Sequence, residues 1–323
     1  MNRIGRLAFA LVAFSCAGAA LAQQPYPSRP VRLVVGFAPG GAADIVARAL
    51  SEGLSRALGQ PVVIENRAGA GSSIAAENVA KSPPDGYSIL IASPSSISVN
   101  PALNPKLGYK ASDLAPITKV SSSPLVIVVN PATDINTVGE LVAVAGKRPG
   151  FLNYATSGIG SAPHFGAALF SQLTGVKMVH VPFKGGAPAV VSVVGGDTQL
   201  SFATPPSVMP MVKAGRLRAL AVTTPERSPL MPDIPGMREA GVPSMSLSFW
   251  YGLFVPAGTP PDIVKKIYDA TAAAAYRPEY KATLAREGTE MAISHSPEEF
   301  AAFLVQDAKF WVKLARDSGA TAD

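Results

Sequence analysis

The sequence predicts an α/β protein of two lobes, each containing a mostly parallel β-sheet. Apolar runs rich in β-branched residues alternate with helical patterns along the chain, a spacing typical of parallel strands joined by right-handed crossovers. The 323 residues exceed what one hydrophobic core usually supports. Two strand-like runs also follow one another directly within residues 115–130, which is typical of a chain crossing from one lobe into another.

Residues 1–22 have the features of a cleaved secretory signal. Arg3 and Arg6 precede an apolar stretch over residues 7–20, and Ala20-Leu21-Ala22 fits a small-x-small cleavage site. The only cysteine, Cys16, lies inside the apolar stretch after a poor lipobox, so we expect a cleaved signal rather than a lipid anchor. We therefore expect a periplasmic or exported chain of residues 23–323, without disulfides.

Charge and composition argue against several classes of function. The formal net charge is +6, and two of these charges leave with the signal, so the remaining chain is mildly basic and has no run of Lys and Arg. This argues against nucleic acid as a partner. The three histidines have no acidic residue at metal-ligand spacing, so we expect no metal and no other cofactor.

The first strand–turn–helix unit carries a candidate site. Residues 31–37 (VRLVVGF) predict a buried strand, residues 38–43 (APGGAA) predict a tight turn, and a helix runs from Asp44 to Leu58 before Gly59. Such a turn leaves the first N–H groups of the helix without partners, and Gly40 and Gly41 let the backbone approach an anion. The turn has neither the G-x-G-x-x-G spacing of a dinucleotide site nor the Gly-Lys-Ser/Thr of a P-loop. Taken alone, it also fits an ordinary βα turn.

The next elements continue the first lobe as far as the crossing. Strands are predicted at residues 61–65 and 87–92, and between them a glycine-rich turn (66–73) leads into a helix (74–81). Residues 93–98 follow the second of these strands, at the carboxyl end where open α/β sheets collect ligands. At the crossing, the run SSSP (121–124) is predicted to join the two strands.

The second lobe repeats the same kind of turn. After a helix (138–145) and a strand (151–155) comes the loop TSGIGSAPH (156–164), in which Ser161 suits an N-cap and Pro163 suits the first turn of a helix that continues to Leu173. The remaining predicted elements are strands at 178–183, 200–203, 217–222 and 247–255 and helices at 188–194, 260–275 and 297–318. We assign residues 23–123 plus 248–323 to lobe 1 and residues 124–247 to lobe 2.

Two such turns, one in each lobe, are expected to face one another across a cleft. Amide and hydroxyl donors to a carboxylate contribute roughly 1.5–3 kcal/mol each. About four to six of them support micromolar binding, about 8 kcal/mol net, after the costs of ordering and closure. Such a site needs no buried arginine, which agrees with the mild charge of the chain.

A series of short motifs runs along the chain. In order they are GFAPGG (36–41) with Asp44 and Arg48, ENRAGAG (65–71), PDGY (84–87), YATSG (154–158) with Gly160, Ser161 and His164, VPFKG (181–185) with Pro188 and Ala189, and WYGL (250–253) with PAGTP (256–260). This series resembles the Bug family, the periplasmic solute-binding proteins associated with tripartite tricarboxylate transporters. The match covers the whole chain after the signal, and its specificity comes from the number of motifs in the right order.

The resemblance implies a fold, a ligand class and a site. The fold is the type II-like periplasmic binding protein fold, with a ligand cleft between two lobes that are joined by crossing strands. The ligand is a small carboxylate: a dicarboxylate or tricarboxylate, an acidic amino acid or an aromatic acid. One carboxylate is held by the first loop, often through ordered water, and the opposing loop supplies hydroxyls and amides. The implied ligand-binding residues are Phe37, Ala38, Gly40, Gly41 and Asp44 in the first loop, Thr156, Ser157, Gly158, Ser161 and His164 in the second, and Ser93 and Ala203.

Three positions depart from the family pattern. Ser192, Gln199 and Ala203 stand where the family often has acidic residues. Such acids would pair with the ammonium group of an amino acid. The resemblance, with these changes, therefore favours a simple or aromatic carboxylate.

Several candidate residues have more than one interpretation. Asp44 either caps its helix or orients a water in the cleft. His164, in the first turn of a helix, is expected to be neutral and to contact or support the ligand. His180 and His295 are expected to be structural or at the surface. Lys184 either reaches the mouth of the cleft or is solvated.

The predicted activity is binding, and we expect no enzyme. The closed form, reached by a hinge motion, would be presented as a monomer to membrane transporter subunits or, alternatively, to a sensor kinase. A secreted α/β hydrolase is the other class considered, because Ser161 and His164 are three residues apart. The loop lacks the G-x-S-x-G elbow, which argues against this class.

Overall fold

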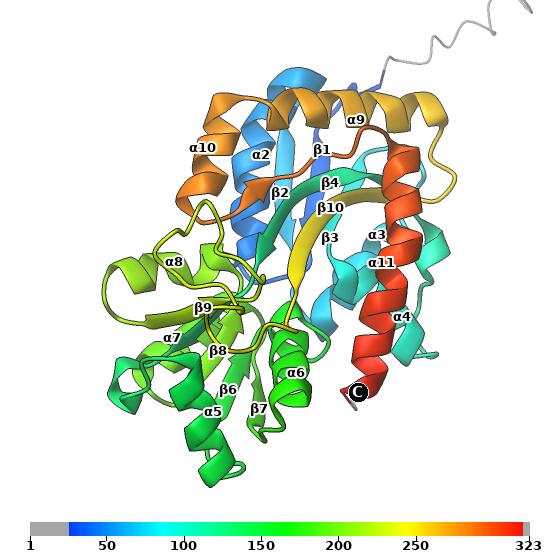
Figure 1. Cartoon of the computed structure of the whole chain (residues 1–323). Coiled ribbons are helices and arrows are strands. Elements are labelled where there is room, and N and C mark those ends of the chain that lie inside the picture. The colour runs from blue at the N-terminus through cyan, green and yellow to red at the C-terminus, as the bar shows by residue number, and fades with distance from the viewer. Residues whose placement is uncertain (1–25, 319–323) are drawn as a thin grey trace, which may run out of the picture.

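A computed structural model describes residues 26–318 of the chain. The predicted signal, its cleavage site and Cys16 lie outside these residues and stay predictions. Two mixed β-sheets form the framework, with helices packed around each (Figure 1). In the view of Figure 1 the first sheet lies above the second, and the chain passes between them along strands β4 and β10.

The first sheet has six strands in the order β11-β4-β10-β3-β1-β2. Their bounds are β1 (Val31–Val35), β2 (Val62–Asn66), β3 (Ser88–Ala92), β4 (Leu114–Pro124), β10 (Ser248–Pro256) and β11 (Glu290–Met291). The β1 strand is parallel to β2 and β3, whereas β10 is antiparallel to both β3 and β4, and β4 is antiparallel to β11. Successive side chains alternate between faces: Leu33 and Val35 pack in one core cluster and Val34 in another.

Helices cover both faces of this sheet. On one face α2 (Ala42–Leu58) packs against α9 (Pro261–Ala275) and α10 (Pro278–Arg286). On the other face lie α3 (Ser73–Ala80) and α11 (Pro297–Asp317), and α4 (Asn100–Leu103) contacts α11. The strands β1 and β3 are therefore covered on both faces, which explains why their sequences are mostly apolar, whereas the edge strand β2 is partly exposed.

The second sheet has five strands in the order β7-β6-β8-β5-β9. Their bounds are β5 (Val126–Val129), β6 (Asn153–Thr156), β7 (Val179–Pro182), β8 (Leu200–Ala203) and β9 (Arg218–Val222). The β6 strand is parallel to β7 and β8, and β5 is antiparallel to β8 and β9. The helices of this part of the chain are α5 (Val138–Lys147), α6 (Ala162–Thr174), α7 (Gly186–Gly195) and α8 (Pro205–Lys213).

Thr223 ties together the two places where the chain crosses between the sheets. The first crossing passes through Leu125, between β4 and β5, and the second passes from Leu247 into β10. The buried hydroxyl of Thr223 accepts the Leu125 N–H at 2.8 Å and donates to the Leu247 carbonyl at 2.7 Å. Its backbone N–H and carbonyl also pair with Leu125 and Leu247, each at 2.9 Å. The two crossings are thus held side by side at the junction of the sheets.

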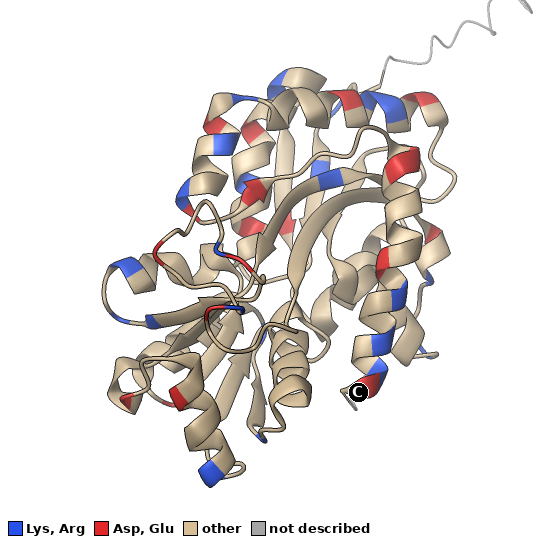
Figure 2. Cartoon of the chain, in the orientation of Figure 1, with Lys and Arg blue, Asp and Glu red and all other residues tan. Residues whose placement is uncertain are grey.

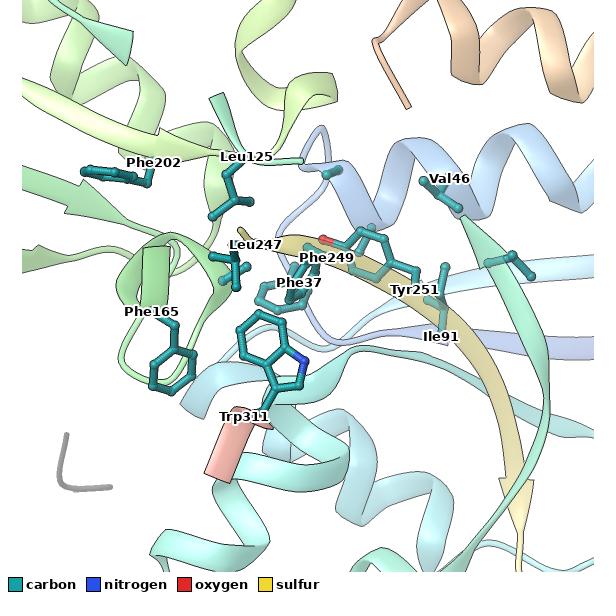
Figure 3. Packing of buried hydrophobic residues seen from close by; sticks show 14 of the residues in the cluster. Phe37, Val46, Ile91, Leu125, Phe165, Phe202, Leu247, Phe249, Tyr251 and Trp311 are labelled. Carbon is teal, nitrogen blue, oxygen red and sulfur yellow. The ribbon is translucent and has the colours of Figure 1, made fainter. Parts of the chain in front are cut away.

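An apolar core is continuous through this junction (Figure 3). Figure 3 shows Phe37 and Phe249 next to Trp311, which reaches in from α11. The Trp311 ring centroid lies 6.0 Å from the rings of both Phe249 in β10 and Phe165 in α6. The C-terminal helix therefore packs on both sides of the junction.

Charged residues of both signs are interspersed on the outer helices, for example along α9, α10 and α11 (Figure 2). Over residues 26–318, no helix has the length and apolar character needed to cross a membrane. The same part of the chain holds no cluster of three or more His, Cys, Asp or Glu side chains suited to a metal ion.

The structure differs from the predicted elements at several points. The run Ser121–Pro124, predicted to join two strands, belongs to β4, because its backbone pairs with residues 248–251 of β10 and the break falls at Leu125. Helices α4, α8 and α10 and the strand β11 were not predicted, and all four are short. In α8 three prolines also read as turn signals, although proline is tolerated in the first turn of a helix, where its missing N–H costs no hydrogen bond.

Candidate functional site

Loops from the two sheets meet and close the space between them. The turn after β1 approaches the turn between β7 and α7 so closely that a Cβ placed on Gly185 would lie 3.1 Å from the Cβ of Ala38. The turn before α3 approaches the loop after β6, and a Cβ on Gly71 would lie 2.9 Å from the Ile159 carbonyl oxygen. Glycine permits this close approach of the backbones. The structure therefore shows the cleft closed, with cavities between the contacting loops.

A cavity of about 250 Å³, the main cavity, lies where these loops meet. It is lined by Gly36 and Phe37 after β1, residues 69–73 before α3, Asn100, Asn104 and Leu107, residues 157–159 after β6, and Pro182, Phe183 and Lys184 after β7. Its volume is slightly below the range of roughly 300–1,000 Å³ that is usual for small-molecule sites, which suits a small metabolite. Lys184 is the only ionisable side chain among these lining residues, so an anion in the cavity meets no like charge.

A small cavity of about 20 Å³ lies beside the main cavity. Phe37 and Ser157 line both. The N-terminal turns of four helices contribute to its wall: Gly41, Ala42 and Ala43 of α2, Ala162 and Pro163 of α6, Gly186 and Ala189 of α7, and Thr204 and Ser207 of α8. Helix N-termini present partial positive charge, so this space attracts an anionic oxygen or a water that bridges to one. Its volume accommodates one water.

The structure brings five of the predicted site residues to the cavity walls. Phe37, Gly41, Ser157, Gly158 and Ala203 line one or both cavities. The other predicted residues, which are Ala38, Gly40, Asp44, Ser93, Thr156, Ser161 and His164, are not among the lining residues. Their assignment to ligand binding remains a prediction, and for several of them the structure shows a role in holding the loops.

Asp44 holds the first loop through four hydrogen bonds. Its buried carboxylate accepts from the Gly40 N–H at 3.0 Å, from Arg48 at 2.8 and 3.1 Å, and from the Asn66 side-chain amide at 3.0 Å. Burial acts to raise the pKa of the Asp44 carboxyl, but the hydrogen bonds from Arg48, Gly40 and Asn66 outweigh it and leave the pKa below its usual value. The structure thus shows a role that was not predicted, in which Asp44 fixes the turn that carries Gly40 and Gly41. An orienting role toward a water in the cleft stays a prediction.

Replacing Asp44 with alanine is expected to loosen this turn. The Gly40 N–H loses its acceptor inside the protein and the Asn66 amide keeps only the Phe37 carbonyl, so we expect the free energy of unfolding to fall by about 2–3 kcal/mol. The matched control is Glu52→Ala, which breaks the exposed Glu52–Arg56 pair on the same helix and should cost below about 0.5 kcal/mol. Urea unfolding at pH 7 measures both, and equal stability of the two variants would contradict this role of Asp44.

The loop after β6 is held by its own hydroxyls. The Thr156 hydroxyl accepts from the Gly158 N–H at 3.2 Å, and the Ser161 hydroxyl donates to the Gly158 carbonyl at 2.6 Å. Ser161 is the N-cap of α6, as predicted, but its hydroxyl makes no cap hydrogen bond. Instead of pairing with His164, it is committed to Gly158, so the two residues do not form a nucleophile–base contact.

Two stacked histidines form hydrogen bonds with this loop. His164 accepts the Gly160 N–H at Nδ1 (3.2 Å), and His180 Nε2 lies 2.6 Å from the Thr156 hydroxyl. The two imidazole rings stack at 4.3 Å, and His180 stacks in turn on Tyr154 at 5.0 Å. Burial, and then the neighbouring His180 ring, lower the pKa of His164 to about 4, and burial lowers the pKa of His180 to about 4. Both are therefore neutral near pH 7, as predicted for His164.

Sequence reasoning missed several contributors to the main cavity, Asn104 and Leu107 among them, and two of the missed contributors show why. The first is the turn over residues 69–73, whose signal in the sequence was the glycine run of ENRAGAG. The second is Asn100 in α4, whose side-chain amide donates to the Ala70 and Gly71 carbonyls at 3.2 and 3.3 Å and to the Ser73 hydroxyl at 2.7 Å. A single asparagine distant in sequence carries no local signal, because its role depends on the folded position of the turn.

A closed cleft between two α/β sheets, with a metabolite-sized cavity at the meeting loops, defines a two-lobed solute-binding protein. The sequence matches the model of the tripartite tricarboxylate transporter family receptor over residues 46–319, and the chain belongs to this family. The family is one of periplasmic substrate-binding proteins, which confirms both the predicted fold class and the resemblance to the Bug family.

Individual relatives agree with this assignment. The chain is 35% identical to BugT of Bordetella pertussis over 324 residues, which covers 99% of each protein. It superimposes with a TM-score of 0.87 on a solved R. palustris structure with adipate, at 34% identity and covering 92% of this chain and 99% of that one. MatC from Rhodopseudomonas palustris with bound malate gives a TM-score of 0.84 at 30% identity, covering 90% of this chain and 99% of that one.

Proposed function

We propose that this protein captures a small carboxylate in the main cavity and hands it to the membrane subunits of a tripartite tricarboxylate-type transporter. The observation that carries the proposal is the lining of the two cavities. Glycine and serine loops and four helix N-termini surround the space, Lys184 lies at its wall, and no Asp or Glu of the described chain lines it. Such a lining favours an anion over a cation.

The three departures from the family pattern narrow the ligand class. Ala203 lines the small cavity, where a family acid would place a negative charge. Ser192 is buried and pairs with the Thr198 hydroxyl at 3.1 Å, and Gln199 accepts the Asn153 N–H at 2.9 Å. None of the three offers a carboxylate to an ammonium group. We therefore favour di- and tricarboxylates or aromatic acids over amino acids, and relatives solved with adipate and malate support this.

The proposal also covers how the protein reaches the periplasm, which partner receives the ligand and whether the protein has catalytic activity. Residues 1–22 direct the chain to the periplasm and are removed after Ala22, leaving a monomer that acts without cofactor and without catalysis. The alternative partner is a sensor kinase, in which case the same closed form signals instead of delivering the ligand. Deleting the gene of this protein distinguishes the two, since loss of carboxylate uptake supports transport, whereas unchanged uptake with lost gene induction supports sensing.

A thermal-shift screen of residues 23–323 tests the ligand class. The panel is malate, citrate, adipate, glutamate, nicotinate, benzoate and terephthalate at about 1 mM. For a micromolar site, binding adds RT ln(1 + [L]/Kd), about 4 kcal/mol, which raises the unfolding temperature by several degrees. We expect a shift with at least one acid that lacks an ammonium group and none with glutamate.

Two other outcomes would correct the proposal. A shift with glutamate would show that the missing acids do not exclude amino acids. The absence of any shift, together with mass spectrometry of a denatured extract that finds no prebound acid, would contradict carboxylate capture itself.

A further inference from the structure

The main cavity has a polar end that the two predicted loops do not supply. It is formed by residues 69–73, which lead into α3, and it carries the hydroxyl of Ser72. These residues belong to the first sheet, and the same cavity is also lined by Pro182, Phe183 and Lys184, which follow β7 of the second sheet.

The Ser72 hydroxyl has no partner within residues 26–318. The residue is fully buried, and its Oγ makes no hydrogen bond. Ser72 is the N-cap of α3, but the side chain does not cap the helix. Its Oγ instead lies against Gly36, where a Cβ would come within 1.8 Å of it, and both residues line the main cavity. A buried hydroxyl without a hydrogen-bond partner is costly, so we expect a polar group of a ligand in the cavity to form a hydrogen bond with the Ser72 hydroxyl.

Two further features give this end a preference for negative charge. Helix α3 begins at Ser73, so its positive dipole end points to the same turn. Lys184 lines the same cavity, and its ammonium has no carboxylate within ion-pair distance in the described chain. Asn100 fixes the turn by holding the Ala70 and Gly71 carbonyls, which keeps those oxygens away from an anion.

We propose that this end is a second anion subsite, formed by the Ser72 hydroxyl, the N-terminus of α3 and Lys184, and that it takes the distal carboxylate of an α,ω-dicarboxylate. The inference rests on the proposed function, which puts a carboxylate in the main cavity; we place that first carboxylate beside the small cavity, near the helix N-termini. The lining of the main cavity also includes Phe37, Leu107 and Phe183, whose apolar side chains suit a methylene spacer. A monocarboxylate of equal length leaves the second subsite unfilled.

Calorimetry with adipate and hexanoate tests the subsite, since the two acids have the same chain length and differ by one carboxylate. In the wild-type protein we expect adipate to bind at least about tenfold more tightly. Ser72→Ala should weaken adipate binding by about tenfold and Lys184→Gln by about threefold, with hexanoate affinity unchanged in both. Ser96→Ala is the matched control, because Ser96 is equally buried and unpartnered but lines neither cavity.

The stability of the ligand-free variants separates binding from structure. Removing an unpartnered hydroxyl should leave the unfolding temperature of Ser72→Ala unchanged or higher, whereas a merely structural role would lower it. Adipate affinity within twofold of wild type in both variants would overturn the subsite, as would equal losses for adipate and hexanoate. A wild-type protein that binds neither acid nor any other carboxylate would instead contradict the proposed function.

Discussion

Gly41→Val is expected to weaken carboxylate binding by at least about 100-fold, about 2.7 kcal/mol, while the protein stays folded. Gly41 is the N-cap of α2 with φ −80° and ψ 168°, a conformation that valine adopts without strain. A Cβ there would lie 3.3 Å from the Ala38 carbonyl oxygen and 3.8 Å from the Gly186 nitrogen on the other side of the cleft. The two methyl groups of valine extend beyond this Cβ into the small cavity and toward Gly186, so closure is obstructed.

Calorimetry with the acid identified by thermal shift measures the loss. Gly41→Ala adds only the Cβ, so we expect it to lose less carboxylate affinity than Gly41→Val. Gly146→Val is the matched control, because a Cβ at Gly146 meets no atom within 4 Å and lies far from the cavities. Undiminished affinity in Gly41→Val would show that the anion site is elsewhere, and a lower unfolding temperature without ligand would show that the substitution damages the fold.

Local sequence patterns were sufficient for most of the fold. The run VRLVV and its glycine turn predicted β1 and the start of α2, because a strand buried on both faces is continuously apolar and a turn into a helix needs glycine. The sequence predicted where the chain crosses between the lobes, but it placed the end of the first crossing strand too early. The run Ser121–Pro124 reads as a loop until its pairing with β10 is known. Pairing of this kind joins residues more than 120 positions apart, and no local pattern carries it.

The candidate site was predictable to the extent that it is made of turns. Gly41, Ser157 and Gly158 stand on strand–turn–helix units and do line the cavities. The resemblance implied that Ser93 lies in the cleft; Ser93 is fully buried and is not among the lining residues of either cavity, so its assignment stays a prediction. His180 was expected to be structural or at the surface, and its contact with Thr156 arises only because β7 pairs with β6 in register. Roles that depend on register or on the packing of distant segments remain beyond sequence reasoning of this kind.

The stacked histidines are expected to make stability fall steeply with acid. In the unfolded chain each has its ordinary pKa of 6.5, and in the folded protein both have a pKa of about 4. As pH falls below 6.5 the unfolded state takes up protons that the folded state refuses, so the free energy of unfolding falls until pH reaches about 4. The loss is about 2–3 kcal/mol for each histidine, with His180 at the lower figure because it is partly exposed.

Urea unfolding between pH 7 and pH 4.5 measures this loss, and substitution assigns it. His164→Asn keeps an acceptor for the Gly160 N–H, and His180→Gln keeps a partner for the Thr156 hydroxyl, so the double variant should fold and lose most of the slope. Acid is also expected to weaken carboxylate binding. Protonation of His164 at Nδ1 removes the acceptor for the Gly160 N–H, so binding should weaken over the same pH range as stability. A wild-type protein whose stability is flat from pH 6.5 to pH 4.5 would show that the two rings are not held neutral by the fold.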